Sequence, residues 1–124
     1  MVVDSKARVL LIRRANPPFQ GQYALPGGFV DVGESVEDGC RRELLEETGV
    51  KAGKLQRVGV YSDPQRDPRG HSVAVAFVTR VRSAKAEAGD DDAAVEWVGD
   101  WRTQDLAFDH KIIIADAMKL LSKP

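Results

Sequence analysis

Apolar positions divide the chain into short runs, separated by segments rich in proline, glycine and charged residues. Bounded apolar runs predict strands over 8–14, 54–63, 72–81 and 95–98. The run at 72–81 is apolar on both faces, which favours a central strand. The stretch 23–30 is typical of extended chain interrupted by Pro26, Gly27 and Gly28, and loops are predicted at 15–22, 64–71 and 87–94.

Two stretches have the pattern of helices. Ser35 is a good N-cap with Asp38 three residues later, a variant of the capping box, and Gly49 lies where a C′ glycine ends a helix. The apolar residues of 109–121 also recur at helical spacing. Because strands dominate and one helix is central and one C-terminal, we expect an α+β fold in which helices cover a mixed sheet.

Composition narrows the class of protein. A chain of 124 residues with 43% hydrophobic and 30% charged residues is consistent with one globular domain, 1–124. A net charge of −1 argues against nucleic acid or an anionic membrane as partner. The lone Cys40 excludes an internal disulfide, no apolar run reaches about 18 residues, and the N-terminus lacks a signal-peptide pattern. We therefore expect a cytoplasmic protein.

The central helix carries three glutamates, Glu43, Glu46 and Glu47, at spacings that make like charges neighbours. At about 100° per residue, Glu47 falls between Val36 and Cys40, and Glu43 lies about 20° to the other side. Glu46 is further round on the same flank. We therefore expect these carboxylates to prolong an inward-facing apolar stripe.

Carboxylates packed in this way need a counter-charge. Arg41 and Arg42 point more than about 90° away from Glu47 on the helical wheel, so they are poorly placed to neutralise all three glutamates, although they can reach Glu34. A divalent cation such as Mg²⁺ or Mn²⁺ prefers carboxylate oxygens. From geometry alone, a metal site and a solvated acidic face remain equally open.

The spacing of the motif favours the metal site. Gly28, Glu34 and the run RELLEETGV (42–50) reproduce the pattern G-x5-E-x7-R-E-U-x-E-E-x-G-U, with U a bulky aliphatic residue. This resembles the Nudix box of hydrolases that cleave a nucleoside diphosphate linked to another group. The resemblance, with the box at 28–50, implies an α/β/α sandwich, a Mg²⁺ cofactor for which Mn²⁺ substitutes, and the hydrolysis of a phosphoric anhydride.

The resemblance also implies roles for individual residues. Glu43, Glu46 and Glu47 would hold one or more Mg²⁺ ions, and the carbonyl of Gly27 would add a ligand. Arg42 would orient Glu43, and Glu34 would brace the loop before the helix. Which carboxylate deprotonates the attacking water varies in the family and stays open.

A further acidic ligand often comes from a loop beyond the box. In the loop 87–94, one of Asp90, Asp91 and Asp92 is expected to reach the metal, with Asp91 and Asp92 preferred, while a solvated acidic turn is the alternative. Glu96, in the following strand, could lie on either face.

The segment 61–77 resembles a subgroup of Nudix ADP-ribose pyrophosphatases. The resemblance favours Arg66 and Arg69 as phosphate or ribose partners, with Asp67 and His71 fixing the loop or touching a sugar hydroxyl. The alternative is a rigid prolyl hairpin with solvated charges. Two aromatic residues, Phe19 and Tyr23, are candidates to stack on adenine, or else belong to the core.

The segment 106–117 also resembles that subgroup, and His110 there has either a capping or packing role or a ligand contact. Only MVVD precedes the turn at 4–6, so the edge formed by a first strand is expected to be short, truncated or completed by a partner. Subgroup members are commonly homodimers. The expected reaction is hydrolysis of ADP-ribose to AMP and ribose 5-phosphate; the alternatives are another nucleotide substrate or a non-catalytic ADP-ribose sensor.

Overall fold

The computed structural model describes residues 1–82 and 94–123. The strands of this part are β1 (Val2–Val3), β2 (Val9–Arg13), β3 (Tyr23–Ala24), β4 (Gln56–Tyr61), β5 (Ala74–Arg80) and β6 (Val95–Val98). The helices are α1 (Val36–Thr48), the short 3₁₀ helix η1 (Trp101–Thr103) and α2 (His110–Ser122). Each predicted strand and helix is therefore present, with ends that differ by a few residues.

The strands form one mixed sheet in the order β3-β2-β1-β5-β4, and β6 pairs with β2. The pairs are antiparallel except for β1 with β5. The prediction of a central 72–81 strand is confirmed, because β5 lies between β1 and β4.

The position of the N-terminal segment corrects one expectation. Val2 and Val3 do not form a shortened edge, because Val3 pairs with Val9 of β2 while both valines pair with β5. A two-residue strand thus occupies an interior position of the sheet. The short turn at 4–6 then returns the chain to β2, where the buried Asp4 carboxylate accepts hydrogen bonds from the backbone N–H groups of Lys6 and Arg8.

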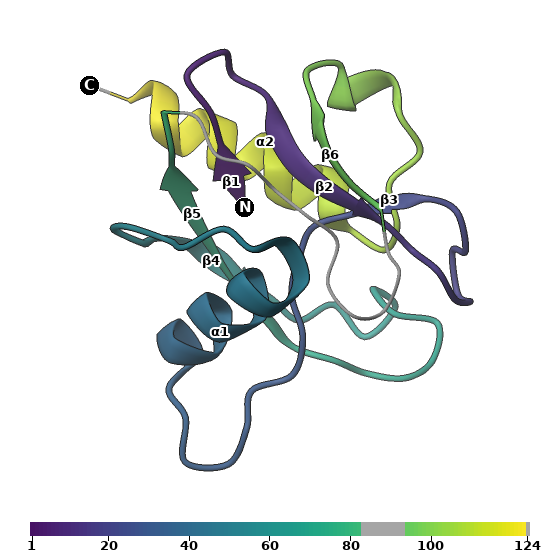
Figure 1. Cartoon of the computed structure of the whole chain (residues 1–124). Coiled ribbons are helices and arrows are strands. Elements are labelled where there is room, and N and C mark those ends of the chain that lie inside the picture. Colours follow the sequence, from purple (N-terminus) through teal and green to yellow (C-terminus); the bar gives the residue numbers. More distant parts are fainter. Residues whose placement is uncertain (83–93, 124) are drawn as a thin grey trace.

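The two helices cover opposite faces of the sheet (Figure 1). Successive side chains of a strand point to opposite faces, and the core follows this alternation. On one face, Leu10 packs in a cluster with Leu44 of α1. On the other, Val9 and Leu11 pack with Ile114 of α2. The alternation gives the expected α/β/α sandwich.

Helix α1 has the expected ends. The Ser35 hydroxyl accepts a hydrogen bond from the Asp38 backbone N–H at 3.1 Å, which satisfies one of the unpaired donors of the first turn. At the other end Gly49 adopts φ 73°, a left-handed conformation that favours glycine. Neither long helix of the described chain has the length and apolarity that a bilayer crossing requires.

Candidate active site

A cleft of about 510 Å³ opens beside α1. The glycine-containing segment 24–30 and one side of α1 form two of its walls. The other walls are the start of β5 with the preceding loop, and the residues at the start of α2. Segments far apart in the sequence therefore meet at this place.

Glu43 and Glu47 both line the cleft, whereas Glu46 lies outside its lining. The exposed fraction of the side chain is 18% for Glu43 and 59% for Glu46. The prediction that the glutamates continue one stripe of the helix with Val36 and Cys40 agrees with this placement, since both of those residues line the same cleft.

The stripe does not enter the core, however, which corrects the expectation of an inward-facing apolar side. Val36 is 37% exposed. The buried side of α1 instead runs through Leu44 and Thr48, which is fully buried and bonds its hydroxyl to the Leu44 carbonyl. Glu43 and Glu47 thus face a cleft next to the core, where charged groups remain accessible to solvent and ligand.

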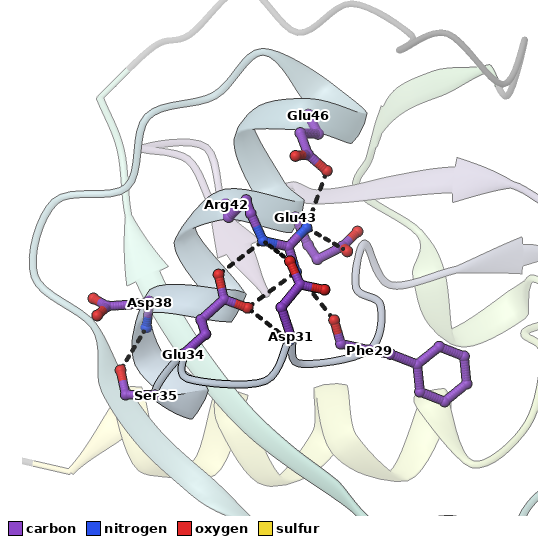
Figure 2. A network of polar contacts seen from close by, with 8 residues as sticks. All are labelled: Phe29, Asp31, Glu34, Ser35, Asp38, Arg42, Glu43 and Glu46. Atoms are coloured by element: carbon purple, nitrogen blue, oxygen red, sulfur yellow. Dashed lines mark hydrogen bonds and ion pairs between the residues drawn. The ribbon is translucent and has the colours of Figure 1, made fainter.

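Arg42 is the centre of a polar network (Figure 2). Its Nε donates to Glu34 at 2.8 Å, and its Nη1 donates to Glu43 at 2.9 Å and to Glu46 at 3.2 Å. Its Nη2 donates to the Phe29 carbonyl and to the second oxygen of Glu34. The contact with Glu43 is the one that the orienting role of Arg42 requires.

Arg42 reaches further round the helix than its direction on the helical wheel indicates. The wheel gives only the direction of the Cα–Cβ bond, and the long side chain curves along the helix surface to contact two of the three glutamates. Glu47 accepts a hydrogen bond from the backbone N–H of Gly27 at 2.9 Å. Each glutamate of the box therefore has a defined position before any cation binds.

Glu34 connects the loop to the helix, as the resemblance implies. It accepts from Arg42 and from the backbone N–H of Asp31 at 3.0 Å, and these bonds, the Arg42 bond first, lower the pKa of its carboxyl group. The same contact with Glu34, followed by that with Glu43, raises the pKa of Arg42. Loop and helix are held as an ion-paired unit.

Gly28 permits the close approach of the loop to α1. A Cβ atom at this position would lie 2.5 Å from Oε2 of Glu43, closer than side chains tolerate. A side chain at Gly28 would thus occupy the space of the Glu43 carboxylate.

The donor chemistry fits a hard divalent cation, since two carboxylates, Glu43 and Glu47, line one cleft. In residues 1–82 and 94–123, no three His, Cys, Asp or Glu side chains converge into a group that could hold a metal ion. Glu46, turned toward Arg42, is the predicted ligand that stays apart. Asp91 and Asp92 lie outside the described residues.

The two arginines of the loop 63–72 that were predicted to contact substrate differ in burial and in partner. Arg66 donates to both carboxylate oxygens of Asp109 at 2.9 and 2.8 Å and to the Ser72 hydroxyl, and its side chain is 8% exposed. Arg69 pairs with Asp67, and its side chain is 53% exposed. Of the two arginines, Arg69 is the more accessible to a ligand.

His71 contacts the Ser62 carbonyl through Nε2 at 2.9 Å, so it closes the base of this loop. Asp67 accepts from the backbone and side chain of Arg69, and these contacts, the side-chain bond first, lower the pKa of Asp67. The structure thus supports the loop-fixing interpretation for both residues.

His110 joins α2 to the glycine segment. Its Nδ1 accepts a hydrogen bond from the Leu25 backbone N–H at 3.0 Å, and the ring lines the cleft. Burial lowers the pKa of His110 to about 4, with Arg66 and Arg14 adding to the effect and Asp109 opposing it. The ring is therefore neutral at pH 7, as an acceptor at Nδ1 must be.

Tyr23 is in the core, which corrects its assignment as a candidate for adenine stacking. It is 7% exposed, belongs to the cluster around Val9 and Ile114, and lies under the Arg13 guanidinium at 4.1 Å. Phe19 stays partly exposed and packs edge-on against Phe108 with ring centroids 5.0 Å apart.

Sequence reasoning missed the cleft residue Arg14 and the anchoring role of Asp109. Arg14 is the last residue of a predicted strand, and Asp109 is the first residue of a predicted helix. A charged residue at the end of an element carries no signal of its partner, which only the packing of distant segments supplies.

Comparison with known proteins gives a consistent family. A model of the NUDIX domain matches residues 1–118. An ADP-ribose pyrophosphatase of Methanocaldococcus jannaschii is 44% identical over 118 residues, which cover 95% of this chain and 70% of the relative. The ADPR responsive transcriptional repressor NtrR of Acinetobacter baylyi is 34% identical, and the match covers 98% of this chain but half of the repressor.

A solved structure is also similar. The NUDIX domain of Shewanella oneidensis NrtR, cocrystallised with ADP ribose, superimposes with a TM-score of 0.87 at 33% identity. The match covers 93% of this chain and 78% of that domain.

Proposed function

The chain belongs to the NUDIX family, and from this premise we propose that it hydrolyses ADP-ribose to AMP and ribose 5-phosphate with Mg²⁺, for which Mn²⁺ substitutes. Water adds to one phosphorus atom of the diphosphate while the bridging P–O bond breaks. The observation that carries the proposal is the 44% identity with an archaeal ADP-ribose pyrophosphatase over 95% of this chain.

The roles of the residues follow from their contacts. Glu43 and Glu47 would hold the cation at the wall of the cleft, and the Gly27 carbonyl would add a ligand. Glu46, which contacts Arg42, would join them only by turning toward the cleft, and either Asp91 or Asp92 stays a predicted addition. When bound, the cation would neutralise the diphosphate and lower the pKa of a water molecule. Arg42 keeps Glu43 in position through the 2.9 Å contact.

The residues predicted to contact substrate also have different proposed roles. Arg66 supports the loop, because its donors are directed at Asp109 and Ser72. Arg69 is accessible and would contact phosphate or ribose oxygens. Phe19 is the remaining aromatic candidate for the base, since Tyr23 is buried.

The test is a panel of ADP-ribose, NADH, a dinucleoside polyphosphate and 8-oxo-dGTP, each incubated with Mg²⁺ and separated by chromatography. We expect ADP-ribose to have the highest kcat/KM and to yield AMP, and EDTA to abolish turnover. Glu47→Gln should lose activity at unchanged fold. Equal or faster turnover of another substrate would refute the choice of ADP-ribose.

A second function is favoured by the similarity to the ADPR responsive repressor. As a sensor, the protein would bind ADP-ribose with Mg²⁺ and release no AMP. Calorimetric binding to the wild-type protein, together with absent AMP in the same sample, would select this function over hydrolysis.

The predicted homodimer is tested separately by light scattering after size exclusion. A mass near twice 13.6 kDa supports it, and a mass near 13.6 kDa excludes it for this chain.

A further inference from the structure

Arg14 lies between the end of β2 and the loop 15–22. Its backbone N–H donates to the Gln22 carbonyl at 2.9 Å, and its carbonyl accepts from Gly21 at 2.8 Å, so the base of the loop is fixed. The half-buried side chain lines the same cleft as Glu43 and Glu47. Its Nε donates to the Pro18 carbonyl at 2.7 Å, which sets the orientation of the guanidinium.

A second guanidinium reaches the same aromatic ring. The Arg14 guanidinium carbon is 4.9 Å from the ring centroid of Phe108, and that of Arg69 is 5.4 Å from it. Phe108 itself has φ 55°, an unusual left-handed conformation for a bulky residue, and is braced edge-on by Phe19. Three segments of the chain thus converge to place two arginines on one ring.

The charges at this place do not balance. Arg69 has an ion pair with Asp67, whereas Arg14 makes none within residues 1–82 and 94–123. In that same part of the chain, three guanidinium nitrogens have no hydrogen-bond partner. They are Nη1 and Nη2 of Arg14 and Nη1 of Arg69. Burial first, and then the neighbouring Arg69, lower the pKa of the Arg14 guanidinium, while Asp67 opposes them.

We propose that Arg14 and Arg69 together form a phosphoryl-anion site across Phe108, in the cleft that also contains Glu43 and Glu47. Planar guanidinium groups present paired donors that match phosphate oxygens. An anion between them offsets the repulsion of two like charges and accepts from the unused donors. The inference rests on the proposed function in one respect, since the anion is then a phosphoryl group of the nucleoside diphosphate.

The experiment measures the binding of inorganic pyrophosphate by calorimetry in metal-free buffer at low ionic strength. The variants are Arg14→Gln, Arg69→Gln and the double variant, with Arg57→Gln as the matched control. Arg57 is exposed on β4 and lies outside the cleft lining. We expect Kd to rise about tenfold or more for either single variant, to rise further for the double variant, and to stay unchanged for the control.

A pyrophosphate Kd for Arg14→Gln equal to that of the wild-type protein overturns the proposal, because Arg14 then takes no part in binding. An equal rise of Kd in Arg57→Gln also overturns it, because the effect is then one of net charge alone. No detectable binding to the wild-type protein overturns it as well. Arg14→Lys keeps the charge without the planar fork, so we expect an intermediate Kd. If circular dichroism shows Arg14→Gln to be unfolded, the Kd of Arg14→Lys is used in its place.

The outcome is separable from that of the proposed function. Arg14-dependent pyrophosphate binding without ADP-ribose turnover supports the anion site and refutes the hydrolase. ADP-ribose turnover with pyrophosphate Kd unchanged in Arg14→Gln supports the hydrolase and refutes the anion site.

Discussion

Arg41 and Arg42 are adjacent residues of the same chemistry with different contacts. Arg42 donates to Glu34 and Glu43, beside the cleft. Arg41 donates to the carbonyls of Ala52 and Gly53, at the chain segment that follows α1. The pair therefore offers a variant and its control within one turn of helix.

Arg42→Gln should lower kcat for ADP-ribose about 10–100-fold and weaken activation by Mg²⁺, because Glu43 loses the contact that orients it. Arg41→Gln should leave kcat near the wild-type value and lower only the unfolding free energy. Steady-state kinetics over a range of Mg²⁺ concentrations measures both. Equal loss of kcat in the two variants would show that the network around Arg42 has no special part in turnover.

Gly28 is the second residue whose change separates activity from stability. In Gly28→Ala the new methyl group takes the place of the Glu43 carboxylate, which is the end of a flexible side chain and can move aside. We expect kcat to fall about tenfold or more while the unfolding free energy changes by less than about 1 kcal/mol. Gly53→Ala, which meets no atom within 4 Å, is the control for both measurements.

At the scale of elements, the start of α2 holds two walls of the cleft. Asp109 binds Arg66 of the loop 63–72, and His110 binds Leu25 of the glycine segment. Two residues later in that segment, Gly27 donates to Glu47. One helix end thus positions both the expected substrate loop and the segment that contacts a box glutamate.

The neutral His110 should make stability depend on pH. Its pKa is about 4 in the folded chain, against 6.5 for a solvent-exposed histidine, so between these values the unfolded chain binds more protons. The unfolding free energy should then fall as the pH drops from about 6.5 to 4, by on the order of 3 kcal/mol from this group.

His110→Asn retains an acceptor for the Leu25 N–H but does not titrate, so its unfolding free energy should vary less over this pH range. His110→Ala lacks the acceptor and should be destabilised by about 1–3 kcal/mol at pH 7. Urea unfolding between pH 7 and 4.5 measures both effects. If the unfolding free energies of the wild type and of His110→Asn fell equally with pH, the lowered pKa of His110 would be contradicted.

At the scale of the molecule, β1 connects the two parts of the sheet. It pairs with β2 on one side and with β5 on the other. Val2 packs toward Leu44 of α1, and Val3 packs toward Ala117 of α2. Two residues therefore contribute to the core on both faces of the sandwich.

Val2→Ala should lower the unfolding free energy by about 2 kcal/mol, because Val2 is fully buried and its loss leaves a cavity. Val32→Ala, the same change at a fully exposed position, should stay within about 0.5 kcal/mol of wild type. Urea unfolding at pH 7 compares them. A cost for Val2→Ala as small as that of Val32→Ala would mean that β1 contributes little to the core.

The site was predictable to the extent that it is local in the chain. The box pattern indicates Glu34, Arg42 and the glutamates, and the structure brings Arg42 into contact with Glu34, Glu43 and Glu46. The burial of Tyr23 and the pairing of Arg66 with Asp109 were not predictable in this way. Both depend on residues tens of positions apart, for which spacing carries no information.

The sequence by itself determined the two long helices, the strands β2, β4, β5 and β6, and the family, because caps, periodicity and the box act between residues a few positions apart. The tertiary structure alone decided that Val2 and Val3 lie inside the sheet and that α1 turns Glu43 and Glu47 toward a cleft. It alone brought Arg14 to the ring that Arg69 also contacts. Long-range packing selects these arrangements, since local spacing is compatible with several of them.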